Sequence, residues 1–265
     1  MILQVDGVKA HAVRLGEGEP LLLLHGWGPT SVSLDKHMMP LAHLLKDRYS
    51  LSMLDFPGHG ESGPPSGIWG VPEYAAWTLK VMDELALRKT AILAHSFGGR
   101  VALWLAAHHP ERVSRLILTG CAGIKPKKTI KGRLRASLFK LGRGGLLALR
   151  LIPGLKDKAD KSLAALRTEF SSADYLATPE HLRGSFSRIV RQDLRPLLPK
   201  IGQPALLVWG SKDSASPLWM GQLMEKQMPD ACLLVYEEDD HFAYMNQLAR
   251  FATAVDVFME GGRRA

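Results

Sequence analysis

A chain of 265 residues that is 46% hydrophobic and 23% charged can bury a large core without the help of disulfides or metal ions. Its two cysteines, Cys121 and Cys232, form neither a ligand spacing nor a disulfide framework, so we expect a reducing, cytoplasmic location. The longest aliphatic run, Leu21 to Leu24, is far too short to cross a bilayer, and the first residues lack the pattern of a secretory signal.

The net charge of +8 is concentrated in one part of the chain. Residues 121–199 carry 17 Lys or Arg and 6 Asp or Glu, a net charge of +11, which leaves −3 for the remainder. A basic region can attract nucleic acid, acidic lipids or anionic substrates, but it is more often a solvated helical face. No nucleic-acid-binding motif accompanies it, so we expect no nucleic-acid partner and no stable membrane association.

Short apolar runs that are typical of strands alternate with helix-like runs along most of the chain. The expected strands are 2–5 and 8–15, which form a hairpin turned at Asp6-Gly7, and then 20–24, 49–54, 90–94, 113–118, 205–209 and 232–236. The expected helices are 36–46, 72–87, 98–108, 218–228 and 247–259. This alternation predicts an α/β fold with a mostly parallel sheet and helices on both faces.

The alternation stops between residues 121 and 199, where the chain is basic, helix-leaning and interrupted by Pro126, Pro153, Pro179 and Pro196. Reactive groups of parallel sheets gather beyond the carboxyl ends of the strands. We interpret this segment as an insertion that covers that edge. The expected domains are a core of residues 1–120 and 200–265 and a basic helical cap of residues 121–199.

Ser96 lies between the expected strand 90–94 and the expected helix 98–108. A serine in such a place must sit on a sharp turn that holds its hydroxyl out at the carboxyl edge of the sheet. Ala94 and Gly98, two places before and after it, are small enough to let the backbone fold tightly. Ser96 is therefore a candidate nucleophile.

A serine hydroxyl needs a base to take its proton and an acid to orient that base. Asp213 follows the expected strand 205–209, and His241 follows the last expected strand, 232–236. Both side chains should therefore reach the same edge of the sheet as Ser96. The chain order Ser, Asp, His is that of the catalytic triad built on such sheets.

The negative oxygen of a tetrahedral intermediate needs hydrogen-bond donors. His25-Gly26-Trp27-Gly28 follows the expected strand 20–24, and its glycines would let the backbone approach a substrate closely. The backbone N–H groups of Trp27 and Phe97 are the candidate donors. The side chains of Trp27, Phe97 and Phe242 are candidates for the substrate-binding surface.

Five motifs in order resemble those of the α/β-hydrolase superfamily, and more specifically a serine carboxylesterase-like member with a helical cap. They are His25-Gly-Trp-Gly28, Asp55-Phe-Pro-Gly-His-Gly-Glu-Ser62, His95-Ser-Phe-Gly-Gly99, Asp213-Ser-Ala-Ser-Pro217 and Asp240-His-Phe242. The resemblance implies eight strands, with one cap inserted after the sixth. The sequence of this chain departs from the family pattern at two positions. Ala94 replaces a glycine, and Asp240 stands where the family usually has glycine. Asp239 or Asp240 is an alternative to Asp213 as the orienting acid.

Other polar residues of these loops have structural explanations. His25, His59 and Asp55 are expected to brace the glycine-rich loops through hydrogen bonds. The remaining histidines that we considered as metal ligands have no matching carboxylate or cysteine cluster, so we expect no metal and no cofactor; these are His37, His43, His108 and His109.

The leading hypothesis is hydrolysis of a small-molecule carboxylic ester through an acyl-serine intermediate, by a monomer or small homo-oligomer. The same triad also serves carbon–carbon bond hydrolases of anionic ring-cleavage products, lactonases and cofactor-free haloperoxidases. A basic cap would suit an anionic substrate, but Phe242 replaces the tryptophan that such carbon–carbon hydrolases have after the active-site histidine. A small-molecule receptor or signalling partner on the same fold is the non-enzymatic alternative.

Overall fold

A computed structural model describes residues 1–125 and 130–261 of the chain. The chain divides into two compact units. The first comprises residues 1–125 and 180–265, and the second comprises residues 126–179. The first unit contains every sequence-predicted site residue.

The first unit is built on an eight-stranded sheet with the strand order β1-β2-β4-β3-β5-β6-β7-β8. Strands β1 and β2 form an antiparallel hairpin, β2 pairs antiparallel with β4, and all later pairs are parallel. The strands are β1 Ile2–Val5, β2 Val8–Leu15, β3 Glu19–Leu24, β4 Tyr49–Leu54, β5 Thr90–His95, β6 Val113–Thr119, β7 Ala205–Gly210 and β8 Ala231–Tyr236. The predicted fold class is confirmed, and the predicted strands are present with ends shifted by one residue at most.

Alternating apolar side chains of the central strands point to opposite faces of the sheet, and each face has its own core. Leu22 and Leu24 of β3 belong to one core, whereas Leu21 and Leu23 belong to the other. Helices α3 (Val71–Glu84), α4 (Phe97–His108) and α9 (Trp219–Gln227) contribute to the first core. Helices α1 (Leu34–His37), α2 (Met39–Leu45), α10 (Ala243–Asn246) and α11 (Leu248–Gly261) contribute to the second.

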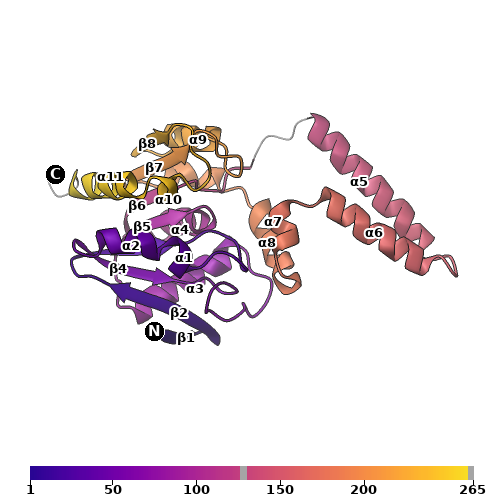
Figure 1. Cartoon of the computed structure of the whole chain (residues 1–265), viewed down its shortest axis with the longest axis horizontal. Coiled ribbons are helices and arrows are strands. Elements are labelled where there is room, and N and C mark those ends of the chain that lie inside the picture. Colours follow the sequence, from indigo (N-terminus) through magenta and orange to yellow (C-terminus); the bar gives the residue numbers. More distant parts are fainter. Residues whose placement is uncertain (126–129, 262–265) are drawn as a thin grey trace. The chain divides into compact units, whose positions relative to one another are not determined.

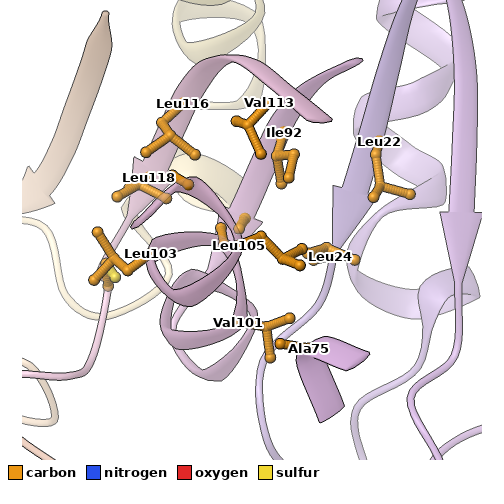
Figure 2. Packing of buried hydrophobic residues seen from close by; sticks show 14 of the residues in the cluster. Leu22, Leu24, Ala75, Ile92, Val101, Leu103, Leu105, Val113, Leu116 and Leu118 are labelled. Atoms are coloured by element: carbon orange, nitrogen blue, oxygen red, sulfur yellow. The ribbon is translucent and has the colours of Figure 1, made fainter. Parts of the chain in front are cut away.

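The nucleophile candidate sits at the end of a closely packed helix. Figure 2 shows apolar side chains of α4 lying against those of three neighbouring strands, namely Val101, Leu103, Leu105, Leu22, Leu24, Ile92, Val113, Leu116 and Leu118. Side chains of this kind lose stabilisation whenever their packing is disturbed, because protein interiors are packed as densely as organic crystals. The packing therefore holds the amino end of α4 in a defined position relative to β3 and β5.

The predicted helix 36–46 is two short helices in the structure, α1 and α2, which meet at Met38. Pro40 lies in the first turn of α2 and has no backbone N–H to donate to a carbonyl in the preceding turn. One continuous helix across this position would lose that hydrogen bond. Pro40 therefore divides the expected helix in two.

Residues 180–199 belong to the first unit, although the predicted cap extends to residue 199. They form a 3₁₀ turn (Glu180–Leu182), α8 (Arg183–Arg191) and a second 3₁₀ turn (Arg195–Lys200). Ile189, Leu194 and Leu198 are buried in the same core as α4. The buried guanidinium of Arg100 donates to the backbone oxygens of Ile189 and Gln192, which ties this segment to α4.

The second unit contains a helical hairpin, in which α5 (Ile130–Leu149) packs antiparallel against α6 (Lys156–Phe170) (Figure 1). A Cβ atom placed at Gly142 would lie 3.4 Å from Leu166 Cδ2, so the glycine allows the two helices to approach closely. Arg150 forms a 2.8 Å ion pair with Asp160 near the turn of the hairpin. A short helix, α7 (Ala173–Ala177), follows.

Candidate active site

Ser96 occupies a strained turn between β5 and α4. Its backbone has φ 50° and ψ −107°, in a region that residues other than glycine rarely adopt. The Ser96 N–H donates to the Thr119 carbonyl over 3.1 Å, and the Ser96 carbonyl accepts from the N–H of Ala122 over 3.2 Å. The surrounding backbone thus enforces the conformation that the small neighbours Ala94 and Gly98 suggested.

Gly98 is required where α4 passes the end of β3. A Cβ atom at this position would lie 2.6 Å from the carbonyl oxygen of Leu24, which is shorter than any normal contact. The Gly98 N–H donates instead to the carbonyl of His25 over 3.1 Å. The sharp turn at Ser96 is therefore joined directly to the loop that begins at His25.

His241 and Asp213 are in direct contact. The distance between His241 Nδ1 and Asp213 Oδ2 is 2.8 Å, and the Asp213 carboxylate is buried. The other oxygen, Oδ1, accepts from the N–H groups of Ala215 and Ser216 over 2.9 and 2.8 Å. Since a carboxylate can only accept here, Nδ1 carries the proton and Nε2 presents a lone pair.

The two alternative acids are occupied elsewhere. Asp240 accepts from the N–H of Phe242 and from the Asn246 amide, so it caps the turn after His241. Asp239 accepts from the side-chain amides of Asn246 and Gln247. Neither carboxylate forms a hydrogen bond or an ion pair with the His241 ring, which pairs with Asp213. The geometry favours Asp213 as the residue that orients His241.

The loops that carry Asp213 and His241 pack together through backbone contacts at the ends of β7 and β8. A Cβ atom at Gly210 would lie 2.2 Å from the Asp240 carbonyl oxygen, so only glycine fits at the end of β7. The N–H of Lys212 donates to the carbonyl of Asp239 over 2.8 Å. These contacts bring residues 28 positions apart in the sequence into hydrogen-bonding distance.

His95 connects the nucleophile turn to the His241 loop. It precedes Ser96 directly, and its ring centroid lies 4.7 Å from that of His241. Burial, together with the neighbouring His241, holds the pKa of His95 well below its ordinary value, so its imidazole is neutral near pH 7. Ser96 and His241 are therefore at the same edge of the sheet.

Neutral histidines brace the loop that carries Trp27. His25 Nδ1 donates to the Gly26 carbonyl over 2.7 Å, while its Nε2 accepts from the N–H of Phe56 over 3.0 Å. His59 Nε2 accepts from the N–H of Gly28 over 3.3 Å. Burial lowers the pKa of His25 to about 4 and that of His59 well below its ordinary value. Both histidines thus brace the loop through hydrogen bonds, as expected from the sequence.

Asp55 holds the adjoining loops together from a fully buried position. Its carboxylate accepts from the N–H groups of Leu34 and Glu61 and lies 2.8 Å from His11 Nδ1. His11 was not among the sequence candidates, because its only signal is a histidine between two alanines in β2. His11 and Asp55 are far apart in the sequence, and they come into contact only because β2 pairs with β4.

Aromatic rings surround the candidate oxyanion loop. The Trp27 ring packs edge-to-face on Phe97, with centroids 5.3 Å apart, and also contacts Phe186. The Phe97 ring is only 2% exposed and belongs to the core, whereas Trp27 and Phe242 are partly exposed. Phe242 lies beside the rings of His95 and His241. Of the three proposed substrate-binding side chains, Trp27 and Phe242 retain an accessible surface.

The described residues contain no group of three or more His, Cys, Asp or Glu side chains that could hold a metal ion. His108 instead stacks on Trp104 and hydrogen-bonds to the Trp104 carbonyl. In the same described part of the chain, no helix combines the length and the apolar character needed to span a bilayer.

Comparison with known proteins is consistent with this geometry. A family model described as "alpha/beta hydrolase fold" matches residues 19–248. A pimeloyl-[acyl-carrier protein] methyl ester esterase of Neisseria meningitidis serogroup B is 30% identical, with 91% of this chain and 93% of the relative covered.

Two solved structures have a similar fold. A hydrolase from Pseudomonas aeruginosa PA01 is 25% identical with a TM-score of 0.70, covering 98% of this chain and 97% of that one. A meta-cleavage product hydrolase from Pseudomonas fluorescens IP01 is 22% identical with a TM-score of 0.73, covering 99% of this chain and 98% of that one. The second likeness concerns the fold alone.

Proposed function

Because this chain belongs to the alpha/beta hydrolase fold family and is an enzyme that hydrolyses ester bonds, we propose that Ser96, His241 and Asp213 are its catalytic triad. The observation that carries the proposal is the 2.8 Å contact between His241 Nδ1 and the buried, doubly anchored carboxylate of Asp213. A buried carboxylate in this position stabilises the positive charge that the imidazole acquires during the reaction.

The proposed reaction has two halves. Ser96 Oγ attacks the ester carbonyl while His241 Nε2 takes the hydroxyl proton, and the proton then passes to the oxygen of the leaving alcohol. The acyl group remains on Ser96 until a water molecule, activated by the same Nε2 atom, attacks it. Asp213 keeps the proton of the imidazole on Nδ1 throughout.

The backbone N–H groups of Trp27 and Phe97 are the proposed donors to the developing oxyanion. Phe97 is the residue after the nucleophile and begins α4, so its N–H lies at the positive end of the helix. The loop of Trp27 is held by the His25 and His59 hydrogen bonds. Donors that are fixed before the reaction stabilise the transition state without a reorganisation cost.

The proposed substrate is a small-molecule carboxylic ester. The name of the Neisseria relative makes methyl esters of medium-length acyl chains the first natural type of ester to assay. Trp27 packs beside Phe97, and Phe242 packs beside His95. Both rings are partly exposed and supply apolar surface for an acyl chain.

The test is a panel of nitrophenyl esters and acyl methyl esters, together with labelling by a serine-directed phosphonate. We expect Ser96→Ala to lower kcat/KM by at least ~10³-fold, because the members of a triad act as a unit, and to abolish labelling. Ser214→Ala is the matched control, since Ser214 is exposed on the Asp213 loop. Equal hydrolysis by wild type and Ser96→Ala would refute the proposal.

A further inference from the structure

The second unit carries a stripe of exposed leucines on α5. Leu134, Leu138 and Leu141 are spaced by four and three residues, so they lie within about 60° of one another around the helix. Their exposed fractions are 64%, 58% and 73%. Helix α6 packs on the adjoining side of α5, where Gly142 faces Leu166. Among the described residues of this unit, none covers the leucine stripe.

The turn between α5 and α6 also carries exposed aliphatic side chains. Leu151 is 85% exposed, and Ile152 and Leu155 are exposed as well. Single exposed leucines are common on protein surfaces, but several along one helix and its turn indicate an interaction site. The group is entirely aliphatic, whereas protein interfaces are enriched in Tyr, Trp, Met and Arg at their centres.

The same unit is strongly basic. Residues 126–179 contain 12 Lys or Arg and 4 Asp or Glu, a net charge of +8, so the rest of the chain is neutral overall. Lys140 and Arg143 are exposed and lie at least about 100° around α5 from the nearest leucine of the stripe. Lys156 and Lys158 are exposed where α6 begins. A leucine face and a cationic polar face on one helix are the features of helices that lie in a membrane interface.

We propose that the α5–α6 hairpin docks reversibly on an anionic lipid bilayer. The leucine stripe enters the boundary between headgroups and acyl chains, and the surrounding Lys and Arg side chains contact the lipid phosphates. Charge alone would fit nucleic acid or an acidic protein equally well. The aliphatic stripe is the second observation, and it favours lipid because it needs an apolar medium rather than a polar partner.

The test is sedimentation of the full chain with vesicles of phosphatidylcholine alone or mixed with phosphatidylglycerol. We expect at least about tenfold more protein to sediment with the anionic vesicles at low salt, and the difference to shrink as salt is added. Ser96→Ala should bind as well as wild type, so the result does not depend on the proposed triad. Failure to bind anionic vesicles at low salt would overturn the proposal.

Matched variants test whether vesicle binding requires the leucine stripe and its neighbouring cations, or any exposed apolar or charged residue of the chain. The double variant Leu138→Gln/Leu141→Gln should lose vesicle binding, whereas Val257→Gln, at a comparably exposed valine (66%) of the first unit, should retain it. Likewise Lys140→Glu/Arg143→Glu should weaken binding more than Lys89→Glu/Lys226→Glu, which alters exposed lysines of the first unit.

Two outcomes would assign the stripe to another occupant and reject the lipid proposal. Binding to soluble polyglutamate with no binding to vesicles would indicate an acidic protein partner. Equal vesicle binding by the leucine variant and the Val257→Gln control would show that charge alone attracts the chain. The wild-type comparison of neutral and anionic vesicles decides the main question even if a variant fails to fold.

Discussion

His95 Nε2 lies 3.1 Å from the carbonyl oxygen of His241. Since the carbonyl can only accept, the ring donates from Nε2 and holds the backbone of the His241 loop from the residue next to Ser96. We expect His95→Leu to lower kcat by about 10- to 100-fold with a small change in KM, because the imidazole of His241 would be less precisely placed. His95→Gln, whose amide can also donate, should recover part of this loss. Steady-state kinetics of the two variants checks it, and equal losses in both would contradict a positioning role.

Asp213 is expected to act through the tautomer of His241. Asp213→Asn replaces an obligate acceptor with an amide, which allows Nδ1 to lose its proton and Nε2 to hold it. We expect kcat/KM for a nitrophenyl ester to fall by about 10⁴-fold. Asp240→Asn preserves an acceptor for the Phe242 N–H and should leave kcat/KM nearly unchanged. A larger loss in Asp240→Asn than in Asp213→Asn would make Asp240 the orienting acid.

Gly120 is predicted to be essential for the geometry of the site. Its φ of +50° lies in the left-handed region, and an added Cβ would lie 3.0 Å from His241 Nδ1 and 3.2 Å from Asp213 Oδ2. Gly120→Ala should cost about 1–2 kcal/mol of unfolding free energy and should also lower kcat. Gly202→Ala is the control, because a Cβ there meets no atom within 4 Å. Urea denaturation and ester assays test both effects, and wild-type values for Gly120→Ala would refute the prediction.

Buried neutral histidines should make the protein less stable in mild acid. Burial lowers the pKa of His25 to about 4 and those of His59 and His95 well below the ordinary 6.5. The unfolded chain therefore takes up protons below about pH 6.5 that the folded protein does not, and the unfolding free energy falls as pH falls. We expect a slope of up to about 1.4 kcal/mol per pH unit for each histidine in this range.

This pH dependence can be measured by urea denaturation between about pH 7.5 and about pH 5.5. An unfolding free energy that stays constant over this range would show that the three buried histidines are not neutral in the folded state.

Much of the fold is visible in the sequence because its signals are local. Apolar runs such as Leu21 to Leu24 predict buried parallel strands. The small residues Ala94 and Gly98, two places before and after Ser96, predict the sharp turn. The order of Ser96, Asp213 and His241 after successive strands follows from the same pattern, since parallel strands end at one edge of a sheet. The division of 36–46 at Met38 follows from Pro40, which is a local feature that the sequence-based expectation did not take into account. The extent of the core segment 180–199, in contrast, depends on packing that no local pattern records.

By itself, the sequence determined the class of fold, the candidate triad and the loop expected to hold the oxyanion, because residue type and strand periodicity are local properties. Only the tertiary structure decided that Asp213 rather than Asp239 or Asp240 meets the His241 ring, that His11 meets Asp55, and that the Phe97 ring is buried. Each of these depends on how loops from distant strands pass one another. Because Gly120 and Gly210 lack a Cβ atom, the loops that carry Asp213 and His241 can pack closely against them. These close contacts form only once the strands have assembled into the sheet.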